Sequence, residues 1–265
     1  DPAVVAAILR AAAPGPRDHF LEIGPGEGAL TRPLLERVGR LDAVELDRDL
    51  AARLEAELGA DPRLRVLQGD ALRLDLAALA GPGGRLRVIG NLPYNVSTPL
   101  LFHLLAQREH VADMLFMLQR EVVDRLAAAP GSRTYGRLSV MAQLACRVEP
   151  LFRVPPGAFR PPPRVASRMV RLVPHPRPPV AVGDEAAFAR VVSAAFGQRR
   201  KRLGNALRGL LDAEAIRAAG VDPGARAEAL DLAAFAALAR AVAARGAAPT
   251  GGPPPPPAPA GARRR

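Results

Sequence analysis

The chain has 265 residues, of which 49% are hydrophobic, and a formal net charge of +11. That length suits one large domain or two small ones, and the single cysteine excludes an internal disulfide framework or a cysteine-based metal cage. No apolar run approaches the ~18 residues of a membrane span and no signal peptide is visible, so we expect a soluble, cytoplasmic protein. Because the chain starts at Asp1, a removed leader is the alternative.

The positive charge is unevenly placed along the chain. Residues 1–150 have a net charge of −1, whereas residues 151–265 have a net charge of +12. This asymmetry favours a basic half that binds a polyanion such as nucleic acid, and a solvated basic surface is the alternative.

Short apolar runs alternate with helical patterns over the first 120 residues. We expect buried strands at residues 19–24, 41–46, 64–70, 86–91 and 112–118. Helices are expected between them at residues 28–38, 48–58, 74–80 and 97–107. Such alternation predicts an α/β fold with a doubly wound parallel sheet, whose ligands bind at the carboxyl ends of the strands.

The remaining segments predict a second, smaller unit. Helices are expected over residues 119–129 and 135–145, and the last strands over residues 146–154 and 165–175. Only helical patterns follow. The expected boundaries are a first domain at residues 1–176, a linker at 177–183, a small helical domain at 184–245 and a disordered Pro/Arg tail at 246–265. Cys146 lies in an apolar stretch and is expected in the core.

Polar residues and glycines end the first three expected strands. The first ends in EIGPGEG, where Gly24 lets the backbone approach a ligand. Glu45 ends the second strand 21 residues later, a spacing at which an acid accepts hydrogen bonds from a ribose. Asp70 ends the third and suits an adenine amino group. Each acid alone is consistent with a turn or cap, but three in register favour a nucleoside site, with S-adenosylmethionine as the cofactor.

The fourth expected strand ends in GNLPY, beside the same site. The lone pair of an aromatic amine is delocalised, so the nitrogen is a poor nucleophile. Two acceptors for its hydrogens, the Asn91 side-chain oxygen and a backbone carbonyl near Leu92–Pro93, favour a tetrahedral nitrogen. Pro93 fixes the backbone, and Tyr94 offers a ring that stacks on the base. The segment is therefore interpreted as a clamp for an amino-purine.

Two later segments are candidates for holding an extruded base and its backbone. Phe159, in a proline-rich loop, is a candidate for the opposite stacking face, and a simple loop anchor is the alternative. The basic residues of QRRKRLGNALR, at residues 198–208, would dominate one side of a helix and suit phosphate contacts, with a solvated helix face as the alternative. The RNA-binding candidates are Arg199, Arg200, Lys201 and Arg202.

The chain resembles the small-subunit ribosomal RNA adenine dimethyltransferases over about residues 1–245. The blocks that carry the resemblance are EIGPGEGALT, VELDRDLAARL, GDAL, GNLPYNVSTPLLFHL, MLQREVVDRLAAAPGSRTYGRLSVMAQ, VPPGAFRPPPRVAS and FGQRRKRLGNAL.

The resemblance implies a Rossmann-like class I methyltransferase domain followed by a small helical domain. It implies dimethylation at N6 of two adjacent adenosines near the 3′ end of small-subunit ribosomal RNA, in the assembling 30S subunit and coupled to its maturation. The catalytic residues it implies are Asn91, Leu92, Pro93, Tyr94 and Phe159. The cofactor-binding residues we expect are Glu22, Gly24, Gly26, Glu45, Leu46, Asp70, Ala71 and Asn91.

Two features depart from the family pattern. The family normally begins with a basic arm and an F-G-Q-N-F-L block, and Asp1 starts just after the place of that block. We therefore expect either a truncated sequence or impaired activity. The proline-rich tail that ends in RRR is also foreign to the family, and at most weak attraction to RNA is expected of it.

Three rival functions fit part of the sequence. Large-subunit adenine methyltransferases that confer macrolide resistance share the NLPY type of clamp. A ribosome-assembly factor that binds immature small subunits without catalysis fits the basic half of the chain. A nucleotide-dependent dehydrogenase fits the acid after the second strand but not the clamp. Neither a metal nor a membrane is expected as a partner, and nothing in the sequence demands more than a monomer.

Overall fold

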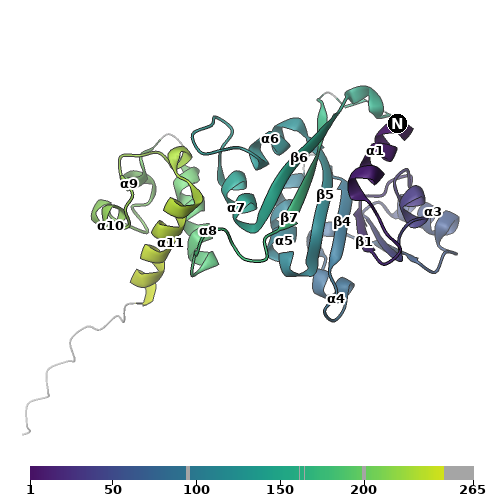
Figure 1. Ribbon diagram of the computed structural model, residues 1–265, viewed down its shortest axis with the longest axis horizontal. Helices are drawn as coiled ribbons and strands as arrows, with labels where there is room; N and C mark the ends of the chain where they lie inside the picture. The colour runs from purple at the N-terminus through teal and green to yellow at the C-terminus, as the bar shows by residue number, and fades with distance from the viewer. Residues whose placement is uncertain (94–95, 161, 164, 199–200, 248–265) are drawn as a thin grey trace, which may run out of the picture.

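The computed structural model describes residues 1–93, 96–160, 162–163, 165–198 and 201–247 (Figure 1). It contains a seven-stranded sheet in the order β3-β2-β1-β4-β5-β7-β6. The strands are β1 (His19–Ile23), β2 (Arg40–Glu45), β3 (Leu64–Gln68), β4 (Leu86–Asn91), β5 (Val111–Gln119), β6 (Cys146–Val154) and β7 (Ser167–Pro174).

The strands β1 to β5 pair in parallel, whereas β7 is antiparallel to β5 and β6 is antiparallel to β7. This arrangement confirms the α/β fold that the sequence predicts. The strand order reverses at β1, which pairs with β2 on one side and β4 on the other. In open α/β sheets the crevice outside such a switch point is where ligands bind.

Helices connect the strands, and further helices come after the last strand in the chain. Those of the sheet domain are α1 (Pro2–Ala12), α2 (Thr31–Leu35), α3 (Arg48–Leu58), α4 (Leu76–Ala80), α5 (Ser97–Ala106), α6 (Arg120–Leu126) and α7 (Arg137–Ala145). The helical unit contains α8 (Glu185–Gly197), α9 (Leu203–Ala206), α10 (Ala213–Ala218) and α11 (Leu232–Ala247). Short 3₁₀ turns are η1 (Ala71–Arg73), η2 (Arg108–His110), η3 (Pro156–Ala158) and η4 (Ala227–Ala229).

Local sequence explains where several helices begin. The Asp47 carboxylate caps α3 by accepting hydrogen bonds from the backbone N–H groups of residues 49 and 50, and Asp184 caps α8 in the same way. Among the described residues, no helix is long and apolar enough to cross a membrane.

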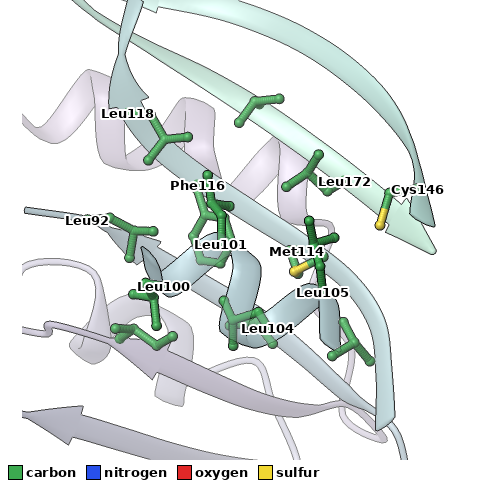
Figure 2. Packing of buried hydrophobic residues seen from close by; sticks show 14 of the residues in the cluster. Leu92, Leu100, Leu101, Leu104, Leu105, Met114, Phe116, Leu118, Cys146 and Leu172 are labelled. Carbon is green, nitrogen blue, oxygen red and sulfur yellow. The ribbon is translucent and has the colours of Figure 1, made fainter. Parts of the chain in front are cut away.

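Both faces of the sheet are buried under helices. Met114, Phe116 and Leu118 of β5 face α5, whereas Leu115 and Met117 face the cluster that contains α1 and α2. A strand buried on both faces is apolar at successive positions, which is why β5 reads as a continuous apolar run. Figure 2 shows the first of these clusters, in which leucines of α5 pack against β5 and the buried Cys146. The expectation that Cys146 lies in the core is confirmed.

A third cluster joins the helical unit to the sheet domain. It combines Phe188 of α8 and Phe235 of α11 with Tyr135, Val140 and Leu144, which lie in or next to α7. Figure 1 shows the helical unit beside α7, at the end of the sheet away from α3. The segment between β7 and α8 connects the sheet domain to the helical unit. The two also share this apolar cluster.

Candidate active site

A cavity of about 310 Å³ opens at the switch point of the sheet. Its walls come from β1 and the glycine-rich loop after it, from the end of β4, from α1 and from the loop around η3. Five predicted site residues line it together, from segments far apart in the sequence: Glu22, Gly24, Gly26, Asn91 and Phe159.

Glycines shape the floor of this cavity. Gly24 and Gly26 have φ angles of 69° and 56°, in the left-handed region where a side chain is strained. A Cβ atom added at Gly26 would meet nothing within 4 Å, so the backbone there borders open space. At Gly90 an added Cβ would lie 2.5 Å from the Ile23 carbonyl oxygen, so a glycine is needed for β1 and β4 to approach each other. The backbone thus leaves a cradle for a ligand.

Glu45 and Asp70 follow neighbouring strands but do not line the cavity. Glu45 is buried, and its carboxylate accepts hydrogen bonds from the Gly26 and Asp47 backbone N–H groups, both at 3.0 Å. The Asp70 Oδ1 atom accepts a hydrogen bond of 2.9 Å from the Leu72 N–H and caps η1. Both acids therefore fill the turn or cap role that the sequence left open, and the second oxygen of Asp70 is not used by that cap.

Leu46 and Ala71 come directly after these two acids. The Leu46 side chain is 68% exposed, which is unusual for a large apolar residue and provides an apolar surface beside Glu45. Ala71 is half-buried at the start of η1. The two residues flank the ends of β2 and β3, where an adenine ring would lie if Asp70 held its amino group.

Glu22 is the buried ionisable group of the cavity. It is 2% exposed, and its Oε2 atom has no hydrogen-bond partner among the residues that the structure describes. Burial raises the pKa of Glu22 to about 7, the nearby Glu45 carboxylate adds to the rise, and the Thr31 hydroxyl opposes it. An unsatisfied buried carboxyl costs free energy, so this atom is suited to a polar or cationic group of a ligand.

The end of β4 presents the predicted clamp. Asn91 is exposed, lines the cavity and pairs with Met117 in the sheet. The Leu92 N–H donates to the Met117 carbonyl at 3.2 Å, and the Leu92 side chain is buried. The Pro93 carbonyl accepts from the Val96 N–H at 3.2 Å, whereas no such bond to the Leu92 carbonyl occurs within the described part of the chain. Leu92 therefore anchors the clamp, and Tyr94 lies outside the described residues.

Phe159 reaches the cavity from the loop after η3. It is half-buried, follows η3, and both packs against the apolar cluster of α1 and lines the cavity. The two interpretations of this residue are compatible, because one face of a ring anchors the loop while another borders the cavity.

The basic candidates lie elsewhere. Lys201 and Arg202 are exposed in the helical unit, between α8 and α9, and Arg199 and Arg200 lie outside the described residues. The helix expected over residues 198–208 is shorter in the structure, since α9 begins at Leu203. Arg202 has an extended backbone and the Lys201 N–H closes a turn onto Gln198, so these two cations are on a loop rather than on one side of a helix.

Helix α1 was not predicted as part of the site. Val4, Val5 and Ile8 of this helix line the cavity, together with Met117 and Met169 from the sheet. The available signals for the helix were the capping Asp1, whose side chain accepts from the residue 3 and 4 N–H groups, and the proline that follows it. The methionines are ordinary core residues in sequence, and only the sheet register brings them to the cavity.

Comparison with known proteins identifies relatives along almost the whole chain. The sequence model of the family described as ribosomal RNA adenine dimethylase matches residues 1–244. A protein of Methylococcus capsulatus named ribosomal RNA small subunit methyltransferase A is 56% identical over 240 residues, which cover 91% of this chain and 93% of the relative. A protein of Pseudomonas aeruginosa with the same name is 54% identical over 243 residues, covering 92% and 91%.

Two solved structures share the fold. A dimethyladenosine transferase from Plasmodium falciparum aligns with a TM-score of 0.78 at 23% identity, covering 93% of this chain and 97% of that chain. The 23S rRNA methyltransferase ErmE aligns with a TM-score of 0.69 at 24% identity, covering 92% and 98%. At these identities the likeness concerns the fold, and it includes the sheet and the helical unit.

Proposed function

The chain belongs to the ribosomal RNA adenine dimethylase family, and from this premise we propose that it dimethylates adenosine at N6 in small-subunit ribosomal RNA. The methyl donor is S-adenosylmethionine. The observation that carries the proposal is the position of Asn91, which ends β4 in the same cavity as the glycine cradle and Phe159. We propose two adjacent adenosines near the 3′ end as the target, and the assembling subunit in the cytoplasm as the substrate, bound by a monomer.

The cradle and the acids beside it fit the cofactor. Gly26 leaves open space along the backbone, and the unpartnered Oε2 atom of Glu22 suits the ammonium group of a methionine moiety. Glu45, Leu46 and Asp70 follow β2 and β3, where they suit the ribose and the adenine. When bound, S-adenosylmethionine supplies a methyl group on a positively charged sulfur, and no group of the protein needs to form a covalent bond.

The end of β4 holds the amine in a reactive orientation. An adenosine N6 amine has two hydrogens, and the Asn91 side-chain oxygen and the Leu92 carbonyl are the acceptors proposed for them. Holding both hydrogens out of the plane of the base localises the lone pair on nitrogen and directs it toward the methyl group. The developing positive charge on nitrogen is stabilised by the same two oxygens, the thioether of the demethylated cofactor is the leaving group, and the acidic N–H proton of the product passes to water, so a strong general base is unnecessary.

A flat pocket for the base completes the proposal. Phe159 lines the cavity that contains Asn91, and we propose it for one face of the base, with Tyr94, which lies outside the described residues, as the candidate for the other. A base within a folded RNA must leave its stack to enter, at a cost of about a few kcal/mol that is smaller in single-stranded segments. Contact with two aromatic rings offsets part of that cost, since stacking contributes about 1–3 kcal/mol per base.

The rival functions explain less. The relatives at 54–56% identity are named as small-subunit methyltransferases, which favours the small subunit over the large-subunit target of the macrolide-resistance group. Their methyltransferase name and the open cavity also favour catalysis over an assembly role without it. A dehydrogenase does not account for Asn91 and Phe159 in the lining of one cavity.

The Asn91→Ala variant tests the proposed clamp. Asn91 is exposed, so the fold should remain, while transfer to unmodified small subunits should fall by roughly 100- to 1,000-fold, the range seen when one preorganised polar group of an active site is removed. Glu214→Ala, at an exposed residue of α10 outside the basic segment 198–208, serves as the control. Equal transfer by wild type and Asn91→Ala, with equal RNA binding, would contradict the role of Asn91.

A further inference from the structure

A second pocket lies where the sheet domain meets the helical unit. It has a volume of about 430 Å³ and is bounded by α6, the loop over residues 127–136, the start of α7 and the end of α8. Its lining includes Arg125, Arg133, Arg137, Glu121, Tyr135 and Phe196. We call it the junction pocket. None of its residues lines the cavity that contains Asn91.

The lining of the junction pocket is strongly basic. Its three arginines are opposed by a single carboxylate, that of Glu121. Within the residues that the structure describes, the Arg125 guanidinium has no hydrogen bond or ion pair, and the Arg137 guanidinium lies 5.0 Å from the centre of the Phe102 ring. A cation stacked on a ring keeps its N–H donors for another partner. Arg125 and Arg137 are therefore the two lining arginines whose guanidinium donors an anion could use.

An aromatic wall fixes the shape of the pocket. The half-buried Phe196 ring meets Tyr135 edge-on at 6.1 Å between centroids and lies 5.7 Å from the Phe235 ring of α11. Tyr135 is 1% exposed and Phe235 is fully buried, so Phe196 is held by the core of the helical unit. A basic pocket with a rigid aromatic wall is suited to a nucleotide, whose phosphate contacts arginine and whose flat parts contact the ring.

The junction pocket lies along the same edge of the sheet as the active site. Helix α6 follows β5 directly, and β5 contributes Met117, which pairs with Asn91. From Met117 to Arg125 the chain spans no more than roughly 20 Å, from the rise per residue in strands and helices. Figure 1 shows α6 and the loop after it at the edge of the sheet where α1 also begins. On the other side, Phe196 precedes the loop of Lys201 and Arg202.

We propose that the junction pocket binds a backbone phosphate of the RNA, a few nucleotides from the adenosine that enters the active site. The inference rests on the proposed function, in that the substrate is RNA. The pocket would bind the RNA backbone between the loop of Lys201 and Arg202 and the active site. It would hold the RNA strand near the extruded base. Phosphate contacts of this kind set register and orientation without reading sequence.

The test removes the guanidinium groups of Arg125 and Arg137. Binding of the Arg125→Gln/Arg137→Gln variant to unmodified small subunits and to protein-free small-subunit ribosomal RNA is measured at several salt concentrations, with methyl transfer in parallel. The control variant, Arg17→Gln/Arg85→Gln, removes the same charge from two exposed arginines that precede β1 and β4, at the opposite edge of the sheet. A second variant, Arg125→Lys/Arg137→Lys, keeps the charge and separates the effect of charge from that of packing over Phe102.

The expected result is a roughly tenfold weaker affinity for RNA in the glutamine variant, with both substrates. The slope of log affinity against log salt should flatten by roughly 0.7–0.9 for each phosphate that the variant no longer binds. The lysine variant should retain most of that slope, and the control should match wild type. Affinity for S-adenosylmethionine should not change in any variant.

Three outcomes would overturn the proposal. One is a glutamine variant that binds both substrates with the salt slope of wild type. A second is an effect on intact subunits but not on protein-free RNA, which would assign the pocket to a protein partner. The third is an equal effect in the control, which would reflect net charge alone. A wild-type chain that transfers no methyl group would refute the proposed function instead, and the binding slopes would still decide the role of the pocket.

Discussion

Asn91 and Glu22 line the same cavity but differ in their exposure to solvent. The difference fits the roles proposed for them, contact with the substrate base for Asn91 and contact with the cofactor for Glu22. Asn91 is exposed at the end of β4 and can meet a substrate that enters from solvent, whereas Glu22 is buried beneath the glycine loop. Of the predicted residues, Gly24, Asn91 and Phe159 line one cavity, because each comes from a strand end or loop at the same edge, and their roles remain predictions. The local bonds of Glu45 and Asp70 were not predictable, since they depend on the orientation of single N–H groups.

The raised pKa of Glu22 predicts that the free energy of unfolding decreases as the pH rises. Its pKa is raised from 4.5 to about 7 in the folded protein, so between these pH values the folded state holds a proton that the unfolded state has released. The contribution of this carboxyl to the free energy of unfolding therefore decreases as the pH rises from about 4.5 to 7, by an amount on the order of 3 kcal/mol. Glu22→Gln should remove this decrease and be more stable than wild type at pH 8 without cofactor.

Urea unfolding at pH 5 and pH 8 measures this effect. The exposed Glu214→Gln variant is the control and should follow wild type at both pH values. A Glu22→Gln protein with the same pH dependence as wild type would show that burial does not hold the proton on Glu22.

At the scale of elements, helices on one face of the sheet pack the core, whereas on the other face a helix also lines the cavity. Helix α5 packs its leucines against β5 and is structural, as Figure 2 shows, whereas α1 on the other face lines the cavity. The strands could be predicted because apolar runs of their length are distinctive. Helix α1 was not predicted: its sequence is rich in alanine, its start is marked only by Asp1 and the proline after it, and its place over the cavity depends on the tertiary fold.

Two leucine-to-alanine substitutions distinguish packing from binding. Leu104 is fully buried in α5, so Leu104→Ala should lower the free energy of unfolding by about 2–5 kcal/mol. Leu46→Ala makes the same change at a side chain that is 68% exposed and should alter stability by less than about 0.5 kcal/mol while weakening cofactor binding. Calorimetric melting and cofactor titration give the two readouts, and a Leu46→Ala variant with unchanged affinity would place the adenine elsewhere.

At the scale of the whole molecule, the sheet domain and the helical unit share a core, and we propose that the first carries catalysis and the second attaches RNA. The net charge of residues 151–265 predicted a basic half, and the structure locates Lys201 and Arg202 on an exposed loop of the helical unit. The packing of α7 into the helical unit could not be predicted, because the sequence marks where the chain crosses from one part to the other and not which surfaces meet.

The basic loop predicts a separation of binding from catalysis. Lys201→Glu/Arg202→Glu should weaken RNA binding and flatten its salt dependence, since each phosphate that is no longer neutralised lowers the slope by roughly 0.7–0.9. Cofactor affinity should be unchanged, because these residues do not line the active-site cavity. Filter binding over a salt series provides the measurement, with Arg17→Glu/Arg85→Glu as the charge-matched control, and an equal decrease in both variants would contradict a specific site.

The most direct test of the central claim is the chemical identity of the product. The chain is incubated with labelled S-adenosylmethionine and small ribosomal subunits that lack the modification, and the RNA is then digested to nucleosides. We predict label in N6,N6-dimethyladenosine from the 3′-terminal segment, and transfer that is slower by roughly 100- to 1,000-fold with Asn91→Ala. Label in another nucleoside, or in large-subunit RNA instead, would contradict the account, as would binding of the subunits by a chain that transfers no methyl group.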